Sequence, residues 1–321
     1  MRCVYGPVPS WRLGLSLGID PVGPPKTCTF DCVYCQLGRT VHKIGGIGEF
    51  KPRVSIEKVL GDLEEALSTV NLRRVRYVTF SGLGEPTLHP QLAEMVEEAR
   101  KLTGKPIAIL TNSSLITDER VLRALLRFDL VVAKLDAADQ RLFEAVNRPA
   151  KGLRIERIVE GIGRLKRRME GRLAIQSMFF HGPGFSNFSA EAVEALAKTV
   201  SRLEPDEVQV NTPTRPPAEP GVFPLTSREL QRVAEAFRER LPSARVISRV
   251  APRLARPSKL RKPSKQEVLE VLKRRPCGVR ELSTVLNTDV EGVSRILGRL
   301  RAEGLIVEKK VGRRVYFRVK V

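Results

Sequence analysis

Residues 28–35 read CTFDCVYC, which places three thiols within eight residues of one loop, directly after a strand candidate at residues 15–20. The chain has five cysteines, and an odd number with this spacing does not describe a disulfide framework. Structural zinc commonly takes four ligands in separated pairs, so three thiolates predict a metal centre with one open position. A [4Fe–4S] cluster held by Cys28, Cys32 and Cys35 meets that description. A zinc knot or unliganded thiols is the alternative.

Downstream of this loop, short β-rich runs alternate with longer amphipathic patterns. The predicted strands cover residues 76–80, 107–110, 130–135, 173–180, 207–210 and 245–247. The predicted helices cover residues 55–70, 91–102, 117–127, 153–169, 190–203 and 227–240, and Ser55 is a candidate N-cap. This βαβα order predicts a parallel sheet with helices outside it. At this length a barrel or partial barrel is the economical α/β solution, with the active site at the C-terminal ends of the strands.

The last part of the chain has a different pattern. Residues 252–264 predict a basic, proline-rich linker between a domain at 1–251 and a second domain at 265–321. The second domain has predicted helices at 265–273, 279–286 and 289–303 and predicted strands at 305–310 and 314–319. This order predicts a small C-terminal winged helix-turn-helix domain, whose third helix points Arg295 and Arg299 away from its apolar side.

The cysteine loop resembles the CxxxCxxC signature of radical S-adenosylmethionine (SAM) enzymes, including an aromatic residue, Tyr34, before the third cysteine. Three further segments resemble motifs of the same family in the same order, each at the end of a predicted strand. They are Ser81-Gly-Leu-Gly-Glu-Pro86, Leu110-Thr-Asn112 and Lys134-Leu-Asp136. The resemblance implies a partial (β/α)6 TIM-like barrel with the cluster and the cofactor at the top.

Carried over residue by residue, the resemblance implies Cys28, Cys32 and Cys35 as cluster ligands. It places Tyr34 beside the adenine, Gly84 and Glu85 at the methionine, and the turn of Thr111 and Asn112 near the ribose or carboxylate. Many relatives have serine where this chain has Lys134, so Lys134 either touches the cofactor carboxylate or pairs with Asp136.

The implied chemistry is reductive cleavage of SAM. One electron enters the cluster, the S–C5′ bond of SAM breaks, and the resulting 5′-deoxyadenosyl radical abstracts a hydrogen from the substrate. The protein orients the reactants and excludes water. An electron donor of the reduced ferredoxin or flavodoxin type is an implied partner.

The opening stretch 5–18, the cysteine loop and residues 80–88 together resemble the broad group of Fe–S oxidoreductases that includes the wyosine-forming tRNA enzymes. Wyosine synthases use a second cysteine-bound cluster. Only Cys3 and Cys277 remain here, too few for three further ligands. The expectation is therefore a one-cluster enzyme related to that group.

Composition narrows the class of protein further. Of the 321 residues 42% are hydrophobic and 29% are charged. No apolar run reaches the roughly 18 residues of a membrane span. The N-terminal residues lack the apolar core of a secretory signal, so a cytoplasmic location is expected. The formal net charge is +20, of which +12 falls in residues 252–321. Such a charge favours polyanionic partners, although the Arg-rich surface of a heat-adapted protein has the same composition.

The working hypothesis is a radical SAM enzyme that modifies RNA, in particular tRNA. In this hypothesis Arg295, Arg299, Arg313 and Arg314 contact phosphates, and an extruded base enters the mouth of the barrel. The first alternative is a radical SAM enzyme that acts on a protein or small metabolite and uses the winged helix as a protein dock. The second is a redox-sensing DNA-binding regulator whose cluster only signals.

Three polar residues near the predicted mouth of the barrel are candidates for substrate contact. Gln176 lies in the strand at 173–180, and Asn211 and Arg215 follow the strand at 207–210. Gln176 and Asn211 equally fit one polar face of a strand. Arg215 stands in a proline-rich loop and is suited to clamp a phosphate or a carboxylate.

Overall fold

The computed structural model describes residues 2–182, 184–248, 263–286, 288–311 and 314–320. Most of the predicted linker and Arg313 lie outside the described residues.

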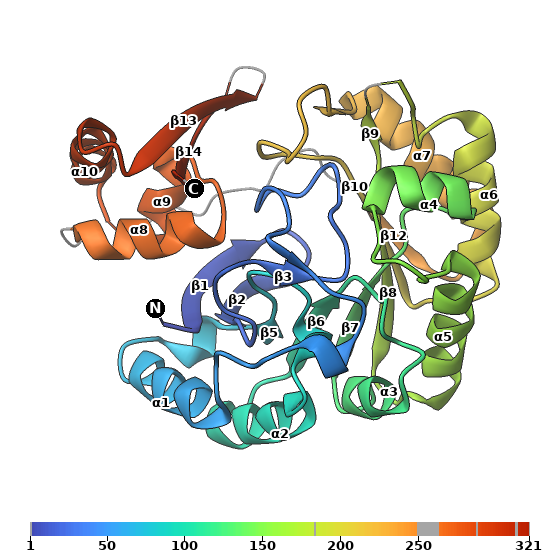
Figure 1. Ribbon diagram of the computed structural model, residues 1–321, viewed down its shortest axis with the longest axis horizontal. Helices are drawn as coiled ribbons and strands as arrows, with labels where there is room; N and C mark the ends of the chain where they lie inside the picture. The colour runs from blue at the N-terminus through green and yellow to red at the C-terminus, as the bar shows by residue number, and fades with distance from the viewer. Residues whose placement is uncertain (1, 183, 249–262, 287, 312–313, 321) are drawn as a thin grey trace.

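An eight-stranded sheet forms the centre of the larger part of the chain and curls into a half-barrel (Figure 1). Its strands in spatial order are β1 (Val4–Ser10), β2 (Gly14–Ile19), β5 (Tyr77–Phe80), β6 (Ile107–Thr111), β7 (Leu130–Lys134), β8 (Arg172–Met178), β10 (Glu207–Asn211) and β12 (Arg245–Ser248). Neighbours are parallel except β1 and β2, which pair antiparallel. The α/β partial barrel predicted from the sequence is therefore confirmed, with one antiparallel strand added at its edge.

Helices cover the convex face of the sheet (Figure 1). They are α1 (Ile56–Leu67), α2 (Leu92–Thr103), α3 (Glu119–Leu125), α4 (Gln140–Asn147), α5 (Ile155–Arg168), α6 (Ala190–Ser201) and α7 (Ser227–Arg240). The hydroxyl of Ser55 accepts from the backbone N–H of Lys58 and caps α1 as predicted. Helix α4 is absent from the sequence prediction. Two short strand pairs, β3 (Thr27–Cys28) with β4 (His42–Lys43) and β9 (Phe180–His181) with β11 (Phe223–Pro224), lie in the loops above the sheet.

Alternation along the strands places neighbouring residues on opposite faces of the sheet, each with its own apolar cluster. Ile107, Ile109 and Val131 belong to the main core beneath the helices. Their sequence neighbours, such as Ala108 and Val132, belong to a separate small apolar cluster on the opposite, concave face. Because successive side chains of a strand point to opposite faces, the inward-facing positions nearer the strand ends are left to line a cavity.

Strand β1 closes the edge of the half-barrel beside β2. Its residues were not predicted as a strand because Pro7 and Pro9 interrupt the pattern, and proline is confined to edge strands. Tyr5 on β1 packs its ring directly over Gly18 of β2, where an added Cβ would lie 2.3 Å from the ring. Its hydroxyl bonds to the Oγ of Ser81 at 2.8 Å. Gly18 is therefore required for this close approach.

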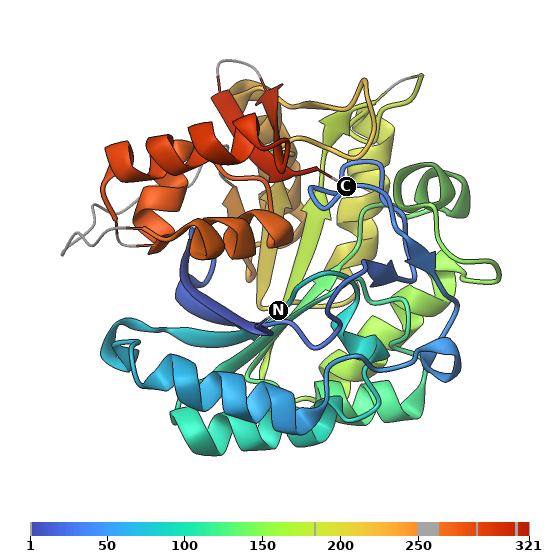
Figure 2. The same cartoon turned by 60° about the vertical axis from the view of Figure 1, so that its left-hand side comes forward.

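The C-terminal part of the chain forms a separate unit. It consists of α8 (Lys265–Arg274), α9 (Val279–Leu286), α10 (Val290–Ala302) and an antiparallel hairpin of β13 (Ile306–Val311) and β14 (Arg314–Val319). The unit has its own apolar core, built on residues such as Val268, Leu282 and Leu297. The helices and hairpin lie at the predicted positions. Figures 1 and 2 both show the unit beside β1, near the loop that follows β10.

Specific contacts attach this unit to the half-barrel. The Arg274 guanidinium stacks 4.8 Å from the centre of the Tyr5 ring and donates to the carbonyl of Arg2. The Tyr316 hydroxyl donates to the carbonyl of Thr214 at 2.6 Å. The unit is thus held against both β1 and the loop after β10.

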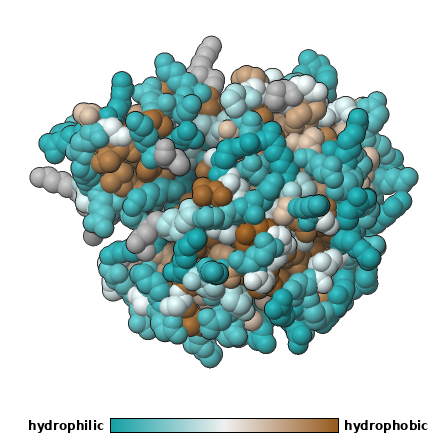
Figure 3. All heavy atoms as spheres, viewed as in Figure 1, coloured by the Kyte–Doolittle hydropathy of each residue, from teal (hydrophilic) through white to brown (hydrophobic). Residues whose placement is uncertain are grey.

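The molecular surface in Figure 3 is mostly hydrophilic, with an apolar area over the C-terminal unit. Exposed large apolar side chains of that unit are Val290, Leu305 and Val315. Among the described residues, no helix combines the length and the apolar character needed to cross a membrane.

Candidate active site

A cavity of about 400 Å³ opens on the concave face of the sheet. Its wall contains all three cysteines of the loop and the following residues predicted to bind cofactor: Tyr34, Gly84, Glu85, Thr111, Asn112 and Lys134. Gln176, Asn211 and Arg215, the candidates for substrate contact, also line it. Of the predicted cofactor residues, Asp136 alone lies outside this wall. The fold thus gathers four motifs that are spread over more than a hundred residues.

Each of the three cysteine sulfurs accepts a hydrogen bond from a different side chain. The Nδ2 of Asn112 lies 3.4 Å from the Sγ of Cys28, and the Nδ2 of Asn147 lies 3.4 Å from the Sγ of Cys32. The third donor is the ammonium of Lys26, whose Nζ lies 3.2 Å from the Sγ of Cys35. Donors of this kind stabilise thiolate charge, and hydrogen bonds to cluster sulfurs help to set the reduction potential.

Lys26 is itself buried, with 7% of its surface exposed. Its Nζ also donates to the carbonyl of Gly38 at 2.6 Å. In the described part of the chain, no carboxylate forms an ion pair with it. A buried ammonium without a carboxylate partner is costly, so the site is built for negative charge at the three sulfurs.

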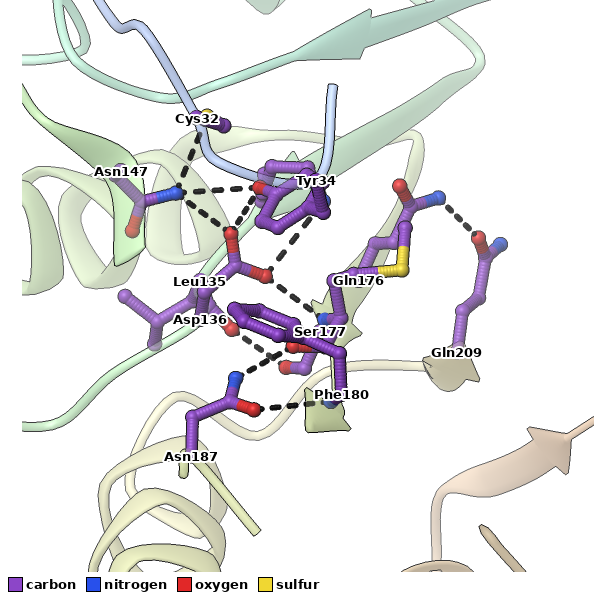
Figure 4. Close-up of polar contacts among 12 residues, drawn as sticks. Cys32, Tyr34, Leu135, Asp136, Asn147, Gln176, Ser177, Phe180, Asn187 and Gln209 are labelled. Carbon is purple, nitrogen blue, oxygen red and sulfur yellow. Dashed lines mark hydrogen bonds and ion pairs between the residues drawn. The ribbon is translucent and has the colours of Figure 1, made fainter. Parts of the chain in front are cut away.

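Asp136 is hydrogen-bonded to Tyr34 of the cysteine loop and to Asn147 (Figure 4). Its carboxylate is buried and accepts from the hydroxyl of Tyr34, from the Nδ2 of Asn147 at 2.7 Å and from the backbone N–H of Met178 at 2.8 Å. The Nζ of Lys134 lies 3.6 Å from this carboxylate and 4.8 Å from the centre of the Tyr34 ring. In this structure Lys134 therefore pairs with Asp136, and Asp136 acts as a positioning residue.

Glu85 occupies the turn that follows β5. Its carboxylate is buried and accepts from the hydroxyl of Thr111 at 2.7 Å, from the backbone N–H of Asn112 at 2.7 Å and from both the N–H and the hydroxyl of Thr87. Burial raises the pKa of Glu85, and these donors oppose that shift. The result is a fixed carboxylate facing the cavity, suited to a ligand ammonium group.

The backbone around Gly84 passes very close to the strand that carries Cys28. A Cβ at Gly84 would lie 1.8 Å from the carbonyl oxygen of Thr27. The N–H of Thr27 bonds to the carbonyl of Leu83, and the N–H of Glu85 bonds to the carbonyl of Thr27. Glycine is therefore required here, and the Gly-Glu turn and the cysteine loop form one connected surface.

The substrate candidates differ in how free their side chains are. The Nε2 of Gln176 donates to the Oε1 of Gln209 at 2.9 Å, so these two amides form a pair across β8 and β10 (Figure 4). The guanidinium of Arg215 donates to the carbonyl of Pro276 at 3.1 Å and forms an ion pair with Glu281 of the C-terminal unit. Arg215 thus joins the two parts of the chain at the rim of the cavity, and its role in substrate binding stays a prediction.

The predicted nucleic-acid contacts lie away from the cavity wall. Arg295 and Arg299 are exposed on α10, and Arg314 is exposed at the start of β14. All three point into solvent on the C-terminal unit, while Arg313 lies outside the described residues.

The donor set fits a cuboidal cluster better than a single ion. No group of three or more His, Cys, Asp or Glu side chains among the residues described is arranged to hold one metal ion. In a cubane cluster each cysteine binds a different iron, so the sulfurs need not converge on one point. Burial raises the pKa of Cys32 to about 11, so cluster binding must displace the proton of this thiol. Together with the three N–H donors, the three cysteines on the cavity wall would hold a [4Fe–4S] cluster.

Three residues of this site were missed by sequence reasoning. Lys26 stands two residues before Cys28, and that proximity is the only signal that could have identified it. Asn147 lies 115 residues from Cys32, and Arg274 lies on a different unit from the cavity it lines, so neither gives a local signal.

Comparison with known proteins agrees with this site. The family model described as Radical SAM superfamily matches residues 23–199. A UPF0026 protein from Methanocaldococcus jannaschii is 38% identical over 239 residues, which cover 74% of this chain and 72% of that protein. A UPF0026 protein from Helicobacter pylori is 30% identical over 310 residues, which cover 96% of this chain and 95% of that protein.

Among solved structures, a radical SAM methyltransferase from Sphaerobacter thermophilus aligns with a TM-score of 0.52 and 16% sequence identity. The alignment covers 73% of this chain and 65% of that one, and at this identity it shows the fold alone. The matched family model spans the cysteine loop, the Gly-Glu turn and the strands that carry them. This chain belongs to the radical SAM superfamily, whose enzymes use a [4Fe–4S] cluster and SAM.

Proposed function

We propose that this radical SAM enzyme modifies RNA, in particular tRNA. When bound, the cluster and SAM supply a 5′-deoxyadenosyl radical for hydrogen abstraction. The chain's own residues position these groups: the cysteine loop holds the cluster, Glu85 fixes the methionine ammonium, and the wall of the half-barrel excludes water. The substrate enters the remaining space of the cavity.

One observation carries the choice of RNA: a strongly basic unit is attached directly at the rim of the cavity. The chain has a net charge of +20, and Arg295, Arg299 and Arg314 are exposed on this unit. None of these three makes an ion pair within the described residues, so their charges are available to phosphates. A base extruded from its stack could then reach the barrel while the unit holds the backbone.

Two finer assignments belong to this proposal. We infer that the C-terminal unit is a winged helix-turn-helix domain, because three helices are followed by a two-stranded hairpin in a unit with its own core. The relation to wyosine-forming tRNA enzymes rests on the resemblance of the opening stretch 5–18, the cysteine loop and residues 80–88. An electron donor of the ferredoxin or flavodoxin type completes the scheme.

A second candidate is an enzyme that acts on a protein or small metabolite. The exposed apolar side chains Val290, Leu305 and Val315 on the C-terminal unit favour it, because such side chains suit a protein dock. A DNA-binding regulator is the third candidate, and the cofactor motifs that meet at the cavity count against it.

The test measures 5′-deoxyadenosine release by the full chain, reconstituted anaerobically with its cluster and reduced with dithionite. Total small RNA from the source cells is added or omitted. The double variant Arg295→Gln/Arg299→Gln is compared with Arg157→Gln, an exposed arginine on the outer helix α5. We expect RNA to stimulate release by wild type and by the α5 variant. The double variant should bind RNA more weakly and with a lower salt dependence, by about 0.7–0.9 in logarithmic slope per lost phosphate contact.

Each other outcome selects a different function. Release that is indifferent to RNA would remove the RNA proposal and favour a protein or metabolite substrate. A bound cluster without any SAM cleavage, together with specific duplex DNA binding, would favour the regulator.

A further inference from the structure

The cavity wall carries an excess of positive charge. Five cationic side chains line it, Arg12, Lys134, Arg215, Arg274 and Arg275, against the single carboxylate of Glu85. Lys134 and Glu85 lie at the cofactor end. The four arginines lie outside the motifs that the superfamily resemblance assigns to SAM or to the cluster.

Several of these cations have a side-chain nitrogen without a hydrogen-bond acceptor. Among the residues that the structure describes, eight buried side-chain nitrogen or oxygen atoms lack a hydrogen-bond partner. Four of the eight belong to this one cavity wall: Lys134 Nζ, whose charge is paired with Asp136, and three arginine nitrogens, Arg12 Nε, Arg274 Nε and Arg275 Nη2. All four are cationic N–H donors. Buried donors are normally satisfied, so a concentration of unsatisfied ones of a single sign indicates a missing acceptor.

Three of these arginines, Arg12, Arg215 and Arg275, are electrostatically connected to one another. Arg215 and Arg275 share one carboxylate, Glu281, whose Oε1 lies 3.1 Å from Arg275 Nη2 without hydrogen-bond geometry. Burial lowers the pKa of Arg12 to about 10, and the charge of Arg215 adds to this shift. Glu207 opposes it, but Glu207 already faces Arg172 and Arg245.

Arg274 links these arginines to the turn at residues 81–86 that is predicted to bind SAM. Its Nη1 donates to the carbonyl of Glu270 at 2.8 Å and lies 3.3 Å from the carboxylate of the same residue, while its guanidinium stacks on Tyr5 and its Nε has no acceptor. The hydroxyl of Tyr5 in turn bonds to Ser81, the residue before the Gly-Leu-Gly-Glu turn. A ligand held by these arginines therefore lies between the C-terminal unit and the loop predicted to hold SAM.

We infer that Arg12, Arg274 and Arg275 form a binding site for a phosphate group of the substrate, at the junction of the half-barrel and the C-terminal unit. Guanidinium groups present paired N–H donors that match phosphate oxygens, and a partly dry cavity strengthens such contacts. The assignment rests on the proposed function only in that the phosphate belongs to a substrate. The source is either the backbone of an RNA or a free phosphorylated metabolite, and the chemistry of recognition is the same.

The test titrates the full chain, loaded with its cluster, with inorganic phosphate in a calorimeter at constant ionic strength with chloride as the balancing anion. The variants are Arg12→Gln and Arg275→Gln, which come from opposite sides of the junction. The control is again Arg157→Gln, which removes the same charge from an exposed helix surface. SAM affinity is measured in parallel.

We expect wild type and control to bind phosphate equally, and each site variant to bind it about tenfold or more weakly, because each loses a charge-assisted hydrogen bond. SAM affinity should stay within about twofold of wild type. Equal phosphate binding by all variants would overturn the assignment. A parallel loss of SAM affinity would overturn it too, because the arginines would then serve the cofactor carboxylate. If Arg275→Gln weakens the attachment of the C-terminal unit to the half-barrel, Arg12→Gln still tests the site, because Arg12 belongs to the half-barrel.

Two competitors identify the source. Displacement of phosphate by ribose 5-phosphate supports a metabolite, and displacement by a short RNA without terminal phosphates supports the RNA backbone. If RNA fails to stimulate SAM cleavage while phosphate still binds through these arginines, the RNA proposal fails and the phosphate site stands.

Discussion

Replacing Lys26 with methionine should lower the reduction potential of the cluster. The ammonium is buried and lies 3.2 Å from the Sγ of Cys35. Two unit charges about 4 Å apart interact by roughly 4 kcal/mol at an effective dielectric constant of about 20. Because the added electron spreads over atoms farther away than this sulfur, we take about half of that value. Roughly 2 kcal/mol corresponds to about 90 mV for a one-electron couple.

The direction of the shift in reduction potential follows from the positive charge of Lys26. Reduction adds negative charge beside the Lys26 ammonium, so removing the ammonium makes reduction less favourable and the potential more negative. The measurement is a potentiometric titration of the anaerobic, cluster-loaded chain followed by electron paramagnetic resonance. Lys43→Met is the matched control, because Lys43 pairs beside Cys28 in the short β3–β4 ladder but is exposed to solvent. Solvent screens that charge, so the control should shift by less than about 20 mV.

The melting temperature of the cluster-free chain distinguishes the loss of the Lys26 charge from a loss of side-chain packing. Without the cluster, Lys26→Met removes a buried ammonium that lacks a carboxylate partner, so the melting temperature of the cluster-free chain should rise. A potential within about 20 mV of wild type, or an equal shift in Lys43→Met, would refute the reasoning.

Three further predictions address the rest of the site. Asp136→Asn turns an amide N–H₂ toward the Tyr34 hydroxyl and the Nδ2 of Asn147, two buried donors that share one carboxylate oxygen. It should cost roughly 3 kcal/mol, seen as a fall of about 6–12 °C in melting temperature, whereas Asp206→Asn, a half-exposed counterpart, should cost far less. Arg215→Gln leaves Glu281 half-paired and should separate the unfolding of the C-terminal unit from that of the half-barrel in calorimetry, and a single unchanged transition would contradict it. Burial raises the pKa of Glu85, so the dissociation constant for SAM should increase as the pH falls through that raised value, where the carboxyl loses its charge. In Glu85→Gln this pH dependence should disappear.

The radical SAM class could be predicted from the sequence because its motifs are short and each lies within a few residues. Cys28, Cys32 and Cys35 lie on one loop, and the turns at Glu85 and Thr111 each follow a strand whose apolar pattern is plain. Strand β8 was predicted slightly too long, since Phe180 pairs in a separate two-stranded ladder after the sheet ends at Met178. Hydrophobic periodicity predicted the helices of the half-barrel except α4, whose eight residues are too few for a clear pattern.

The side-chain contacts around the cysteine loop and between the two parts of the chain could not be predicted from local sequence. Asn147 reaches Cys32 across 115 residues, and Tyr5 meets Ser81 and Arg274 only because β1 folds back antiparallel on β2. Arg215 was predicted to face substrate, but its environment depends on where the C-terminal unit docks, which no local pattern encodes.

The sequence by itself determined the class of chemistry and the order of the βα elements. The spacing of the cysteines and the hydrophobic periodicity of strands and helices can each be recognised within a short stretch of sequence. Only the tertiary structure decided which charges surround the cluster and which arginines enter the cavity. Burial and pairing arise from the packing of distant segments, and a residue's electrostatic role depends on that packing rather than on its place in the chain.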